Sequence, residues 1–374
     1  MGIFATELSV LNYRSFPAFD LALDPGVTVL VGRNAVGKTN LVEALQLLTA
    51  GTSFRKPAPA ELVREGCERG RVALTLEGDG RVLDMALEVA AGRRSFSRNG
   101  KKTTAAGVRG VLPSVLFCPD HLDMVKRSAS VRRAALDDFG VQLNDGYAKL
   151  VASYERTVEQ RNNLLKEWRP DPSLLAAWDE SLAAAGSALL LHRQALLARI
   201  RTHFRDVHAA IAPHECADVA YVPSIDGLDA ILAADDGAAA RDAVSKRFIE
   251  ALAGVRADEL RRGMTLVGPH RDEVLFTIDG RPARDYGSQG QQRTLVLAWK
   301  IAEVQVTRDI LGRSPLLLLD DVMSELDAGR RDAIMGFIEG EIQAVITTTN
   351  LGYFSGDVLD AAKVVRIGDE GPQA

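Results

Sequence analysis

The sequence predicts an α/β fold that is split into two parts by an inserted helical lobe. Unbroken apolar runs at Val27–Val31 and Leu316–Leu319 are typical of strands buried on both faces, and they lie far apart in the chain. Between about residues 120 and 262 turn residues become rare and helical periodicity dominates. We therefore expect an α/β head formed by residues 1–119 and 263–374, with residues 120–262 as the inserted helical lobe.

Antiparallel hairpins are expected inside the head. Residues 71–100 contain the turn signals Gly78-Asp79-Gly80 and Asn99-Gly100 between apolar segments. Val274–Ile278 followed by Asp279-Gly280 predicts a further hairpin, and Ala344–Thr348 a third buried strand.

The expected lobe is made of helices with short, proline-containing interruptions. Helical periodicity covers Tyr147–Trp168, Leu174–Val207 and Ala240–Arg261. No heptad pattern persists for three or four repeats, so we expect a compact lobe and not a long coiled coil.

The composition is that of a soluble globular protein of about two domains. The 374 residues are 47% hydrophobic and 25% charged, and 45 basic against 50 acidic residues give a net charge of −5. Binding of nucleic acid through bulk positive charge is thereby excluded, although a local basic patch is not. Cys67, Cys118 and Cys216 form no C-x-x-C pair, and we read neither a signal peptide nor a membrane span, so the expected compartment is the cytoplasm.

A phosphate-binding loop is predicted directly after the first apolar strand. G-x-x-x-x-G-K-[ST] is matched at every fixed position, with a strand before it and an amphipathic helix after it, by Gly32, Arg33, Asn34, Ala35, Val36, Gly37, Lys38 and Thr39. The glycines let backbone N–H groups approach the phosphates, and the helix N-terminus adds a positive dipole end. Lys38 is expected at the β- and γ-phosphates and Thr39 at Mg²⁺. The alternative is an ordinary glycine-containing turn, which the flanking strand and helix disfavour.

Two acidic residues follow the second apolar strand. Asp320 and Asp321 lie where ligands bind in open α/β sheets, at the carboxyl end of a buried strand. We expect Asp320 to bind Mg²⁺ and Asp321 to act as the general base, so that Lys38 and Asp321 are the catalytic residues. Two solvated acids in a loop are the alternative. No N/T-K-x-D guanine-reading motif is present, which favours ATP as the nucleotide.

Two further segments resemble motifs of the ABC-type ATPases. Their signature loop, which grips the γ-phosphate held by another subunit, is similar to Ser288, Gln289, Gly290 and Gln291, and their D-loop is similar to Ser324-Glu325-Leu326-Asp327. Each segment could instead be only a helix cap, since Ser288 and Gln291 fit a capping box. The switch histidine of that group is replaced within Thr347–Asn350, and Phe117–His121 is the best candidate by position for the Q-loop.

Taken together, these segments and a few others resemble the RecF family of bacterial ATPases, which are related to the SMC proteins. The others are Leu11-Asn12-Tyr13-Arg14-Ser15-Phe16, Asn40 after the phosphate loop, Gly268-Pro269-His270-Arg271-Asp272, and the run from Ser288 to Arg293. The resemblance implies an SMC-like ATPase head and a weak DNA-dependent ATPase that uses ATP and Mg²⁺. It also implies ATP-driven homodimerisation, binding to duplex DNA near single-strand gaps, and action with RecO and RecR to load the RecA recombinase in repair, replication and the SOS response. By the same resemblance, Asn40 and Arg14 would lie at the nucleotide, Arg14 near its adenine or ribose.

Two basic groups are candidates for DNA contacts. Five basic residues surround Phe96 and the Asn99-Gly100 turn, and four lie at an expected helix start: Arg93, Arg94, Arg98, Lys101 and Lys102, then Lys126, Arg127, Arg132 and Arg133. Basic side chains bind DNA by neutralising phosphates, but groups of this kind are often only solvated faces.

A head-to-head dimer would hold two ATP molecules, each bound by Lys38 and Thr39 of one chain and by Ser288 and Gly290 of the other. The two-fold axis would make the two sites equivalent. The alternatives are an ABC transporter ATPase subunit, a non-hydrolysing SMC-like structural module and a small-molecule P-loop kinase. The missing Q-loop and switch histidine disfavour the first, the intact Lys38, Asp320 and Asp321 the second, and the signature-like loop the third.

Overall fold

The computed structural model describes residues 2–233, 237–338, 342–368 and 371–373, and the chain forms two compact units. The first unit comprises Met1–Asp123, Ala210–Ala212 and Val296–Ala374, and the second comprises Met124–Ala209 and Pro213–Leu295. The second unit therefore includes residues 263–295, which we expected in the head. The reason is a long-range pairing within that unit, in which β10 (Glu273–Ile278) lies antiparallel to β9 (Ala217–Val222).

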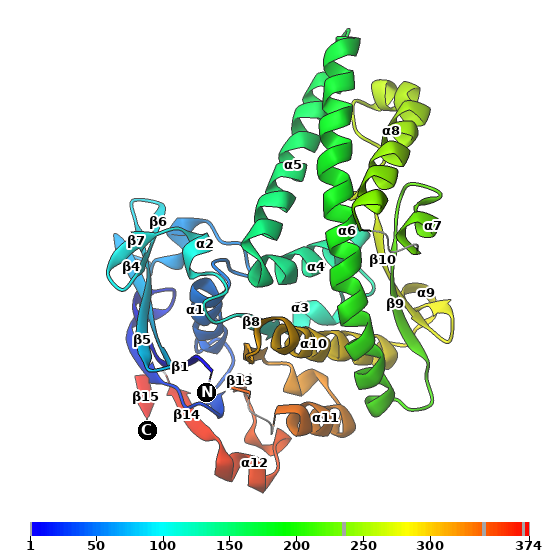
Figure 1. The fold of residues 1–374 in the computed structure, drawn as a ribbon. Helices are drawn as coiled ribbons and strands as arrows, with labels where there is room; N and C mark the ends of the chain where they lie inside the picture. Colours follow the sequence, from blue (N-terminus) through cyan, green and yellow to red (C-terminus); the bar gives the residue numbers. More distant parts are fainter. Residues whose placement is uncertain (1, 234–236, 339–341, 369–370, 374) are drawn as a thin grey trace. The chain divides into compact units, whose positions relative to one another are not determined.

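The first unit contains a six-stranded antiparallel sheet (Figure 1). Its strand order is β2 (Phe16–Ala22), β1 (Phe4–Tyr13), β4 (Arg69–Gly78), β5 (Arg81–Ala90), β6 (Arg93–Arg98) and β7 (Lys101–Thr103). The hairpins expected over residues 71–100 are confirmed. Asn99 and Gly100 both have positive φ angles, 48° and 72°, as a tight two-residue turn between β6 and β7 requires.

A second six-stranded sheet in the same unit is parallel apart from one edge strand. Its order is β15 (Gly371–Gln373), β14 (Lys363–Gly368), β3 (Val27–Val31), β13 (Ala344–Thr348), β12 (Leu316–Asp320) and β8 (Ser114–Phe117). The three apolar strands expected from the sequence are thus neighbours, with β3 beside β13 and β13 beside β12. Their carboxyl ends lie at the same edge of the sheet.

Helix α1 (Lys38–Thr49) packs against strands of both sheets. Its residues Leu41, Leu45 and Leu48 are completely buried, together with core residues from the antiparallel sheet such as Leu8 and Leu74. This is why the helix after the phosphate loop has apolar residues on most of its circumference. The other helices of this unit are short or lie later in the chain: η1 (Pro59–Leu62), α2 (Ala105–Val108), α3 (Pro119–Leu122), η2 (Met323–Glu325), α11 (Ala328–Ile338), η3 (Leu351–Tyr353) and α12 (Gly356–Ala361).

The second unit is mainly helical and overlaps most of the expected lobe of residues 120–262, and a small sheet adds to it. Its elements are α4 (Ala129–Leu143), α5 (Asp145–Leu165), α6 (Pro172–Ile211), α7 (Leu228–Ala233), α8 (Gly237–Arg262) and α9 (Ala283–Tyr286), with β11 (Arg281–Pro282) beside β10. α10 (Gln289–Leu311) begins in this unit and ends in the first. The hairpin predicted at Val274–Ile278 is confirmed by the pairing of β10 with β11.

A buried ion cluster joins α5, α6 and α8. The Arg161 guanidinium is fully buried and donates to Asp179 at 2.8 Å, to Glu259 at 2.5 Å and to the Thr265 hydroxyl at 2.8 Å. Removing one member of such a cluster leaves an uncompensated buried charge and costs about 3–5 kcal/mol. The cluster therefore fixes the positions of α5, α6 and α8 relative to one another.

Helix α6 is also the one described helix that is long and apolar enough to cross a membrane, by length and composition alone. Leu182, Leu189 and Phe204 along it are completely buried inside the unit. A core helix of a soluble protein has the same properties, so this observation is weak evidence for a membrane span.

Candidate nucleotide site

The predicted phosphate loop connects β3 to α1, as the motif requires. Two of its glycines have no space for a side chain. A Cβ atom on Gly32 would lie 2.5 Å from the Ile367 carbonyl oxygen, and one on Gly37 would lie 2.7 Å from the Phe16 ring. Gly37 also has a φ of 106°, a conformation that favours glycine. The loop backbone can therefore turn closely around a phosphate group.

The Lys38 ammonium group lies over this loop. It donates to the carbonyl oxygens of Gly32 and Arg33, each at 2.8 Å. Burial lowers the pKa of Lys38, while the charges of Asp321 and Asp320 act in the opposite direction. The two carboxylates therefore lie close enough to Lys38 for their charges to interact with it. A site for a metal-bound triphosphate needs such a combination of charges.

Thr39 and Asp320 lie side by side at the carboxyl end of the parallel sheet. The Thr39 hydroxyl donates to Asp320 Oδ1 at 3.0 Å. Burial raises the pKa of Asp320, while hydrogen bonds from Thr347 and Thr39 oppose that rise. A hydroxyl and a carboxylate oxygen are ligands that Mg²⁺ prefers, so this pair fits the cation.

Asp321 has an uncommon conformation and an unused acceptor. Its φ is 54°, which is uncommon for a residue other than glycine and is stored strain of the kind found at functional sites. Asp321 Oδ1 is buried and has no hydrogen-bond partner among the described residues. Burial raises its pKa, and Lys38 opposes this. A buried carboxylate oxygen without a partner suits the orientation of a water molecule.

Thr347, at the end of β13, connects the two aspartates. Its fully buried hydroxyl donates to Asp320 Oδ1 at 2.8 Å and accepts from the Asp321 backbone N–H at 2.9 Å. The sequence indicated only that Thr347–Asn350 stands where related proteins carry a histidine. Its role was missed because the contact depends on the parallel register that places Thr347 opposite Asp320.

A second polar network lies behind the loop, around the fully buried Glu43 of α1. Arg14 Nε and Nη2 donate to the two Glu43 oxygens at 2.9 and 2.8 Å, and Ser53 and Tyr13 hydroxyls also donate to this carboxylate. Burial alone would raise the pKa of Glu43, but the hydrogen bonds from Arg14 and Ser53 lower it overall. Arg14 is therefore bound by Glu43, a partner that sequence reasoning missed. Asn40, the other residue expected at the nucleotide, donates to Ser15 Oγ at 3.1 Å.

These features agree with comparisons with known proteins. Residues 4–367 match the family described as RecF/RecN/SMC N terminal domain. The sequence is 38% identical to the DNA replication and repair protein RecF of Gloeobacter violaceus over 372 residues, covering 98% of this chain and 97% of that protein. The chain belongs to the RecF family.

Other relatives and solved structures extend this result. The RecF protein of Symbiobacterium thermophilum is 38% identical over 93% of this chain and 92% of its own length. A structure described as the recombination mediator protein RecF with ATPrS in the RecFOR pathway matches with a TM-score of 0.89 and 28% identity, covering 100% of this chain and 99% of that one. An Smc head bound to the C-winged helix domain of ScpA matches at 15% identity with a TM-score of 0.57, covering 99% of this chain and 96% of that one, and shows the fold alone. The expected SMC-like head fold is confirmed.

The signature-like segment that pointed to the RecF family forms a complete capping box. Ser288 N–H donates to Gln291 Oε1 at 2.8 Å, and Gln291 N–H donates to Ser288 Oγ at 3.2 Å. Ser288 and Gln289 are exposed at the start of the long helix α10. Ser288 thus caps the helix and is also exposed at the helix N-terminus. Its role as a cap therefore does not prevent a contact with an anion.

The D-loop-like segment also makes local contacts. The Ser324 hydroxyl donates to the Asp321 carbonyl oxygen at 2.9 Å, and Asp327 Oδ1 accepts from the Arg330 N–H at 3.0 Å at the start of α11. That backbone hydrogen bond lowers the pKa of Asp327. Phe117–His121 spans the end of β8 and the start of α3, where the Cys118 N–H donates to His121 Nδ1 at 3.4 Å.

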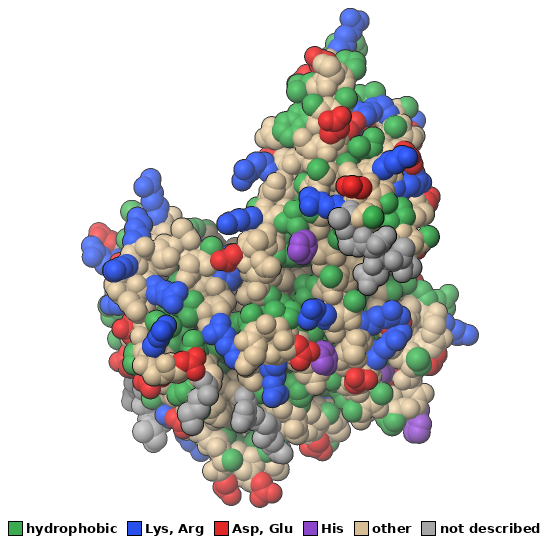
Figure 2. Space-filling view, viewed as in Figure 1, with side chains coloured by type: hydrophobic (Ala, Val, Ile, Leu, Met, Phe, Trp, Pro, Cys, Tyr) green, Lys and Arg blue, Asp and Glu red, His purple; other side chains and the backbone are tan. Residues whose placement is uncertain are grey.

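The two basic groups differ in how many of their side chains are exposed. Around the β6–β7 turn the exposed cations are Arg93, Arg98, Lys101 and Lys102, and Lys and Arg side chains gather over these strands in Figure 2. Arg94 is half-buried and donates to the Pro57 carbonyl oxygen.

The second basic group is only partly a surface feature. Lys126 and Arg127 are exposed, but Arg132 is buried and bidentate to Glu273, at 2.8 and 2.7 Å. Arg133 donates to the Asp272 carbonyl oxygen at 2.5 Å. Arg132 is therefore not available for a DNA contact, because Glu273, a partner far along the chain, holds it in the interior of the second unit, whereas Arg133 is half-buried.

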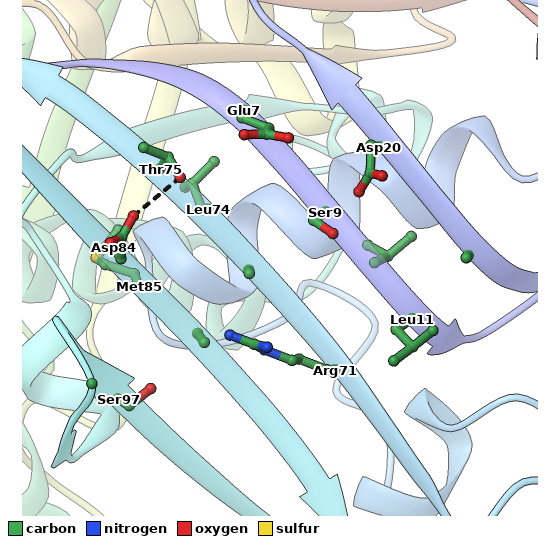
Figure 3. Close-up of a pocket in the computed structure, with 15 residues that line it drawn as sticks. Glu7, Ser9, Leu11, Asp20, Arg71, Leu74, Thr75, Asp84, Met85 and Ser97 are labelled. Atoms are coloured by element: carbon green, nitrogen blue, oxygen red, sulfur yellow. Dashed lines mark hydrogen bonds between the residues drawn. The ribbon is translucent and has the colours of Figure 1, made fainter.

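A hollow of roughly 590 Å³ on the antiparallel sheet is not the nucleotide site (Figure 3). Small side chains such as Ser9, Ala73 and Ala86 form its floor, and the carboxylates of Glu7, Asp20 and Asp84 lie around it. Acidic groups repel a triphosphate, and no phosphate loop borders the hollow. We assign it no nucleotide.

Proposed function

We propose that the chain is an ATP-dependent DNA-binding protein of recombinational repair that acts as a clamp with slow ATP hydrolysis. The observation that carries the proposal is the group formed by Lys38, Thr39, Asp320 and Asp321 at one edge of the parallel sheet. Support comes from the RecF relatives, which are described as DNA replication and repair proteins, and from a RecF structure described with ATP.

In this proposal, the nucleotide is bound by the backbone of residues 32–39 and by Lys38, which would exchange its two carbonyl partners for phosphate oxygens. Thr39 and Asp320 would hold Mg²⁺, which supplies positive charge to the phosphates when it is bound. Asp321 would orient the attacking water through its unpartnered oxygen. An aspartate is shorter than a glutamate and reaches less far, which fits slow hydrolysis.

We further propose that ATP drives dimerisation, with Ser288 and Gly290 of one chain contacting the γ-phosphate bound by the other. The support is chemical: an exposed hydroxyl stands at the N-terminus of the long helix α10, where a positive dipole end favours an anion. Ser324 and Asp327 would lie at the same dimer interface.

DNA binding would use the exposed cations near β6 and β7, with Lys126 and Arg127 as a second contact. A net charge of −5 predicts weak DNA binding by a single chain. A dimer that brings two basic groups to one duplex would bind more tightly, and ATP would thereby control DNA affinity. By family, the partners would be RecO and RecR at gapped DNA, the product a loaded RecA recombinase, and the compartment the cytoplasm.

The test is light scattering of the chain with a nonhydrolysable ATP analogue, with and without gapped DNA, followed by an ATPase assay. The expected result is a dimer only with the analogue, and stronger DNA binding in that state. Asp321→Asn is the matched variant, which should still dimerise and bind Mg²⁺-ATP but hydrolyse it more slowly. A chain that remains monomeric at saturating analogue with DNA present would contradict the proposal.

A further inference from the structure

The turn between α5 and α6 exposes a tryptophan. We define the hairpin tip as residues 166–171, the segment at the top of the α5–α6 hairpin in Figure 1. Trp168 in this tip is 92% exposed, whereas Trp299 is 1% exposed. No other large apolar side chain among those described has so high an exposed fraction. Both faces of its indole ring are therefore open to solvent.

The hairpin tip is ordered by its own contacts. The N–H groups of Lys166 and Glu167 donate to carbonyl oxygens in the last turn of α5. The Asp171 carboxylate accepts from the N–H and hydroxyl of Ser173 at the start of α6. Beneath the tip, Leu164, Leu165 and Leu175 pack with Trp178. Trp168 is thus exposed on a defined turn and not on an unstructured loop.

Positive charges lie on both sides of Trp168. Lys166 and Arg169 belong to the tip, and Gly263, the residue after α8, packs against the Lys166 side chain, which brings Arg262 to the same end of the unit. Among the described residues no carboxylate forms an ion pair with Lys166, Arg169 or Arg262. Of the neighbouring acids, Asp258 pairs with Arg261. Glu167 and Asp171 are the two carboxylates within the tip, and Asp171 also caps α6, so Lys166, Arg169 and Arg262 together outnumber them by one charge.

We propose that the hairpin tip binds unpaired nucleotides of DNA, with Trp168 stacking on a base and Lys166, Arg169 and Arg262 contacting the flanking phosphates. Aromatic side chains beside cations are the usual means of binding single strands, because every base has a flat face and every linkage a negative charge. This inference rests on the proposed DNA-binding function and adds a contact for the single-stranded part of a gap.

The geometry favours a nucleic acid over a protein partner. Aromatic residues that dominate protein interfaces lie in well-packed central regions, where arginine is enriched but lysine and glutamate, both present in this tip, are depleted. Trp168 instead stands on a turn between Lys166 and Arg169, with its ring open on both faces. Exposed Leu174, Leu260 and Met264 at the same end of the unit would lie beside the sugar and base edges.

The experiment compares Trp168→Ala and Trp168→Phe with the wild-type full chain, using the nonhydrolysable ATP analogue and fluorescence anisotropy. The two labelled probes are a blunt duplex and the same duplex with a five-nucleotide gap, and Ile249→Ala, another exposed apolar residue of the second unit, is the control. Loss of one stacked base weakens binding about 5- to 150-fold. We expect W168A to lose that factor on gapped DNA only, while W168F and I249A retain most of the wild-type affinity.

A second readout requires no ATP analogue. Oligothymidylate should quench part of the tryptophan fluorescence of the wild type, and W168F should lose that part, because Trp178 and Trp299 are partly or fully buried. Equal gapped-DNA affinity for W168A and wild type, or equal losses on both probes, would overturn the inference. So would normal DNA binding by W168A with reduced binding to anionic phospholipid vesicles. A wild type that binds neither probe would instead refute the proposed function itself.

Discussion

Replacing Thr347 by valine tests whether its hydroxyl holds the two aspartates in place. Valine has the same shape and suits a buried strand, so the change removes two hydrogen bonds and leaves the packing intact. The lost bonds are the one to the Asp320 carboxylate at 2.8 Å and the one from the Asp321 N–H at 2.9 Å. A hydrogen bond to a charged group contributes about 1.5–3 kcal/mol, and a buried N–H without a partner costs about 1–3 kcal/mol.

The expected loss in the free energy of unfolding of the first unit is therefore about 2.5–6 kcal/mol. Because Asp320 and Asp321 would lose their common partner, Mg²⁺-ATP affinity and hydrolysis should both fall. Calorimetric unfolding measures the first effect, and titration with a fluorescent ATP analogue measures the second. Since the chain has two units, the calorimetric trace must be resolved into separate transitions before the variants are compared.

The matched control is Thr28→Val on the neighbouring strand β3. Thr28 is also completely buried, but its hydroxyl has no hydrogen-bond partner among the described residues. Removing an unsatisfied hydroxyl should leave stability unchanged or slightly increased. If T347V and T28V unfold alike and bind nucleotide alike, the assigned role of Thr347 is incorrect.

Three more predictions address the rest of the site and the second unit. Lys38→Met should abolish ATP binding while the protein stays folded, as equilibrium dialysis and circular dichroism would show; normal affinity would exclude Lys38 from the phosphate site. Ser288→Arg should leave ATP binding intact and prevent analogue-driven dimerisation in light scattering, whereas a normal dimer would exclude the trans contact. Burial lowers the pKa of His270 to about 4, so this side chain is neutral when folded but protonated when unfolded between that value and about 6.5. The second unit should therefore lose up to about 3 kcal/mol of stability as the pH falls from about 6.5 to about 4, and His270→Gln should flatten that dependence in urea unfolding series at each pH.

The features that the sequence predicted well are local ones. The phosphate loop, the apolar strands and the β6–β7 turn each depend on residues close together in the chain, such as Gly37 with its positive φ and the Asn99-Gly100 pair. Their physical requirements can be read from a few neighbouring positions.

What sequence reasoning missed depends on contacts between distant residues. Strand β9 lies in a segment expected to be helical, and it exists because Ala217–Val222 pairs with Glu273–Ile278. The buried carboxylate of Glu43 has its partner Arg14 in the first hairpin, and Arg132 has Glu273. In these two ion pairs, a charged residue that looks like a surface residue in the sequence is neutralised by another that only the fold brings near.

The order of strands in the parallel sheet has a consequence for biosynthesis. β3 has as its neighbours β13 and β14, which are translated more than 300 residues after it. The apolar strand that leads into the phosphate loop therefore has no strand partner from this sheet until those residues have been translated. We expect nascent chains of this protein to depend on chaperones during that interval, and C-terminal truncations before β13 to aggregate rather than fold.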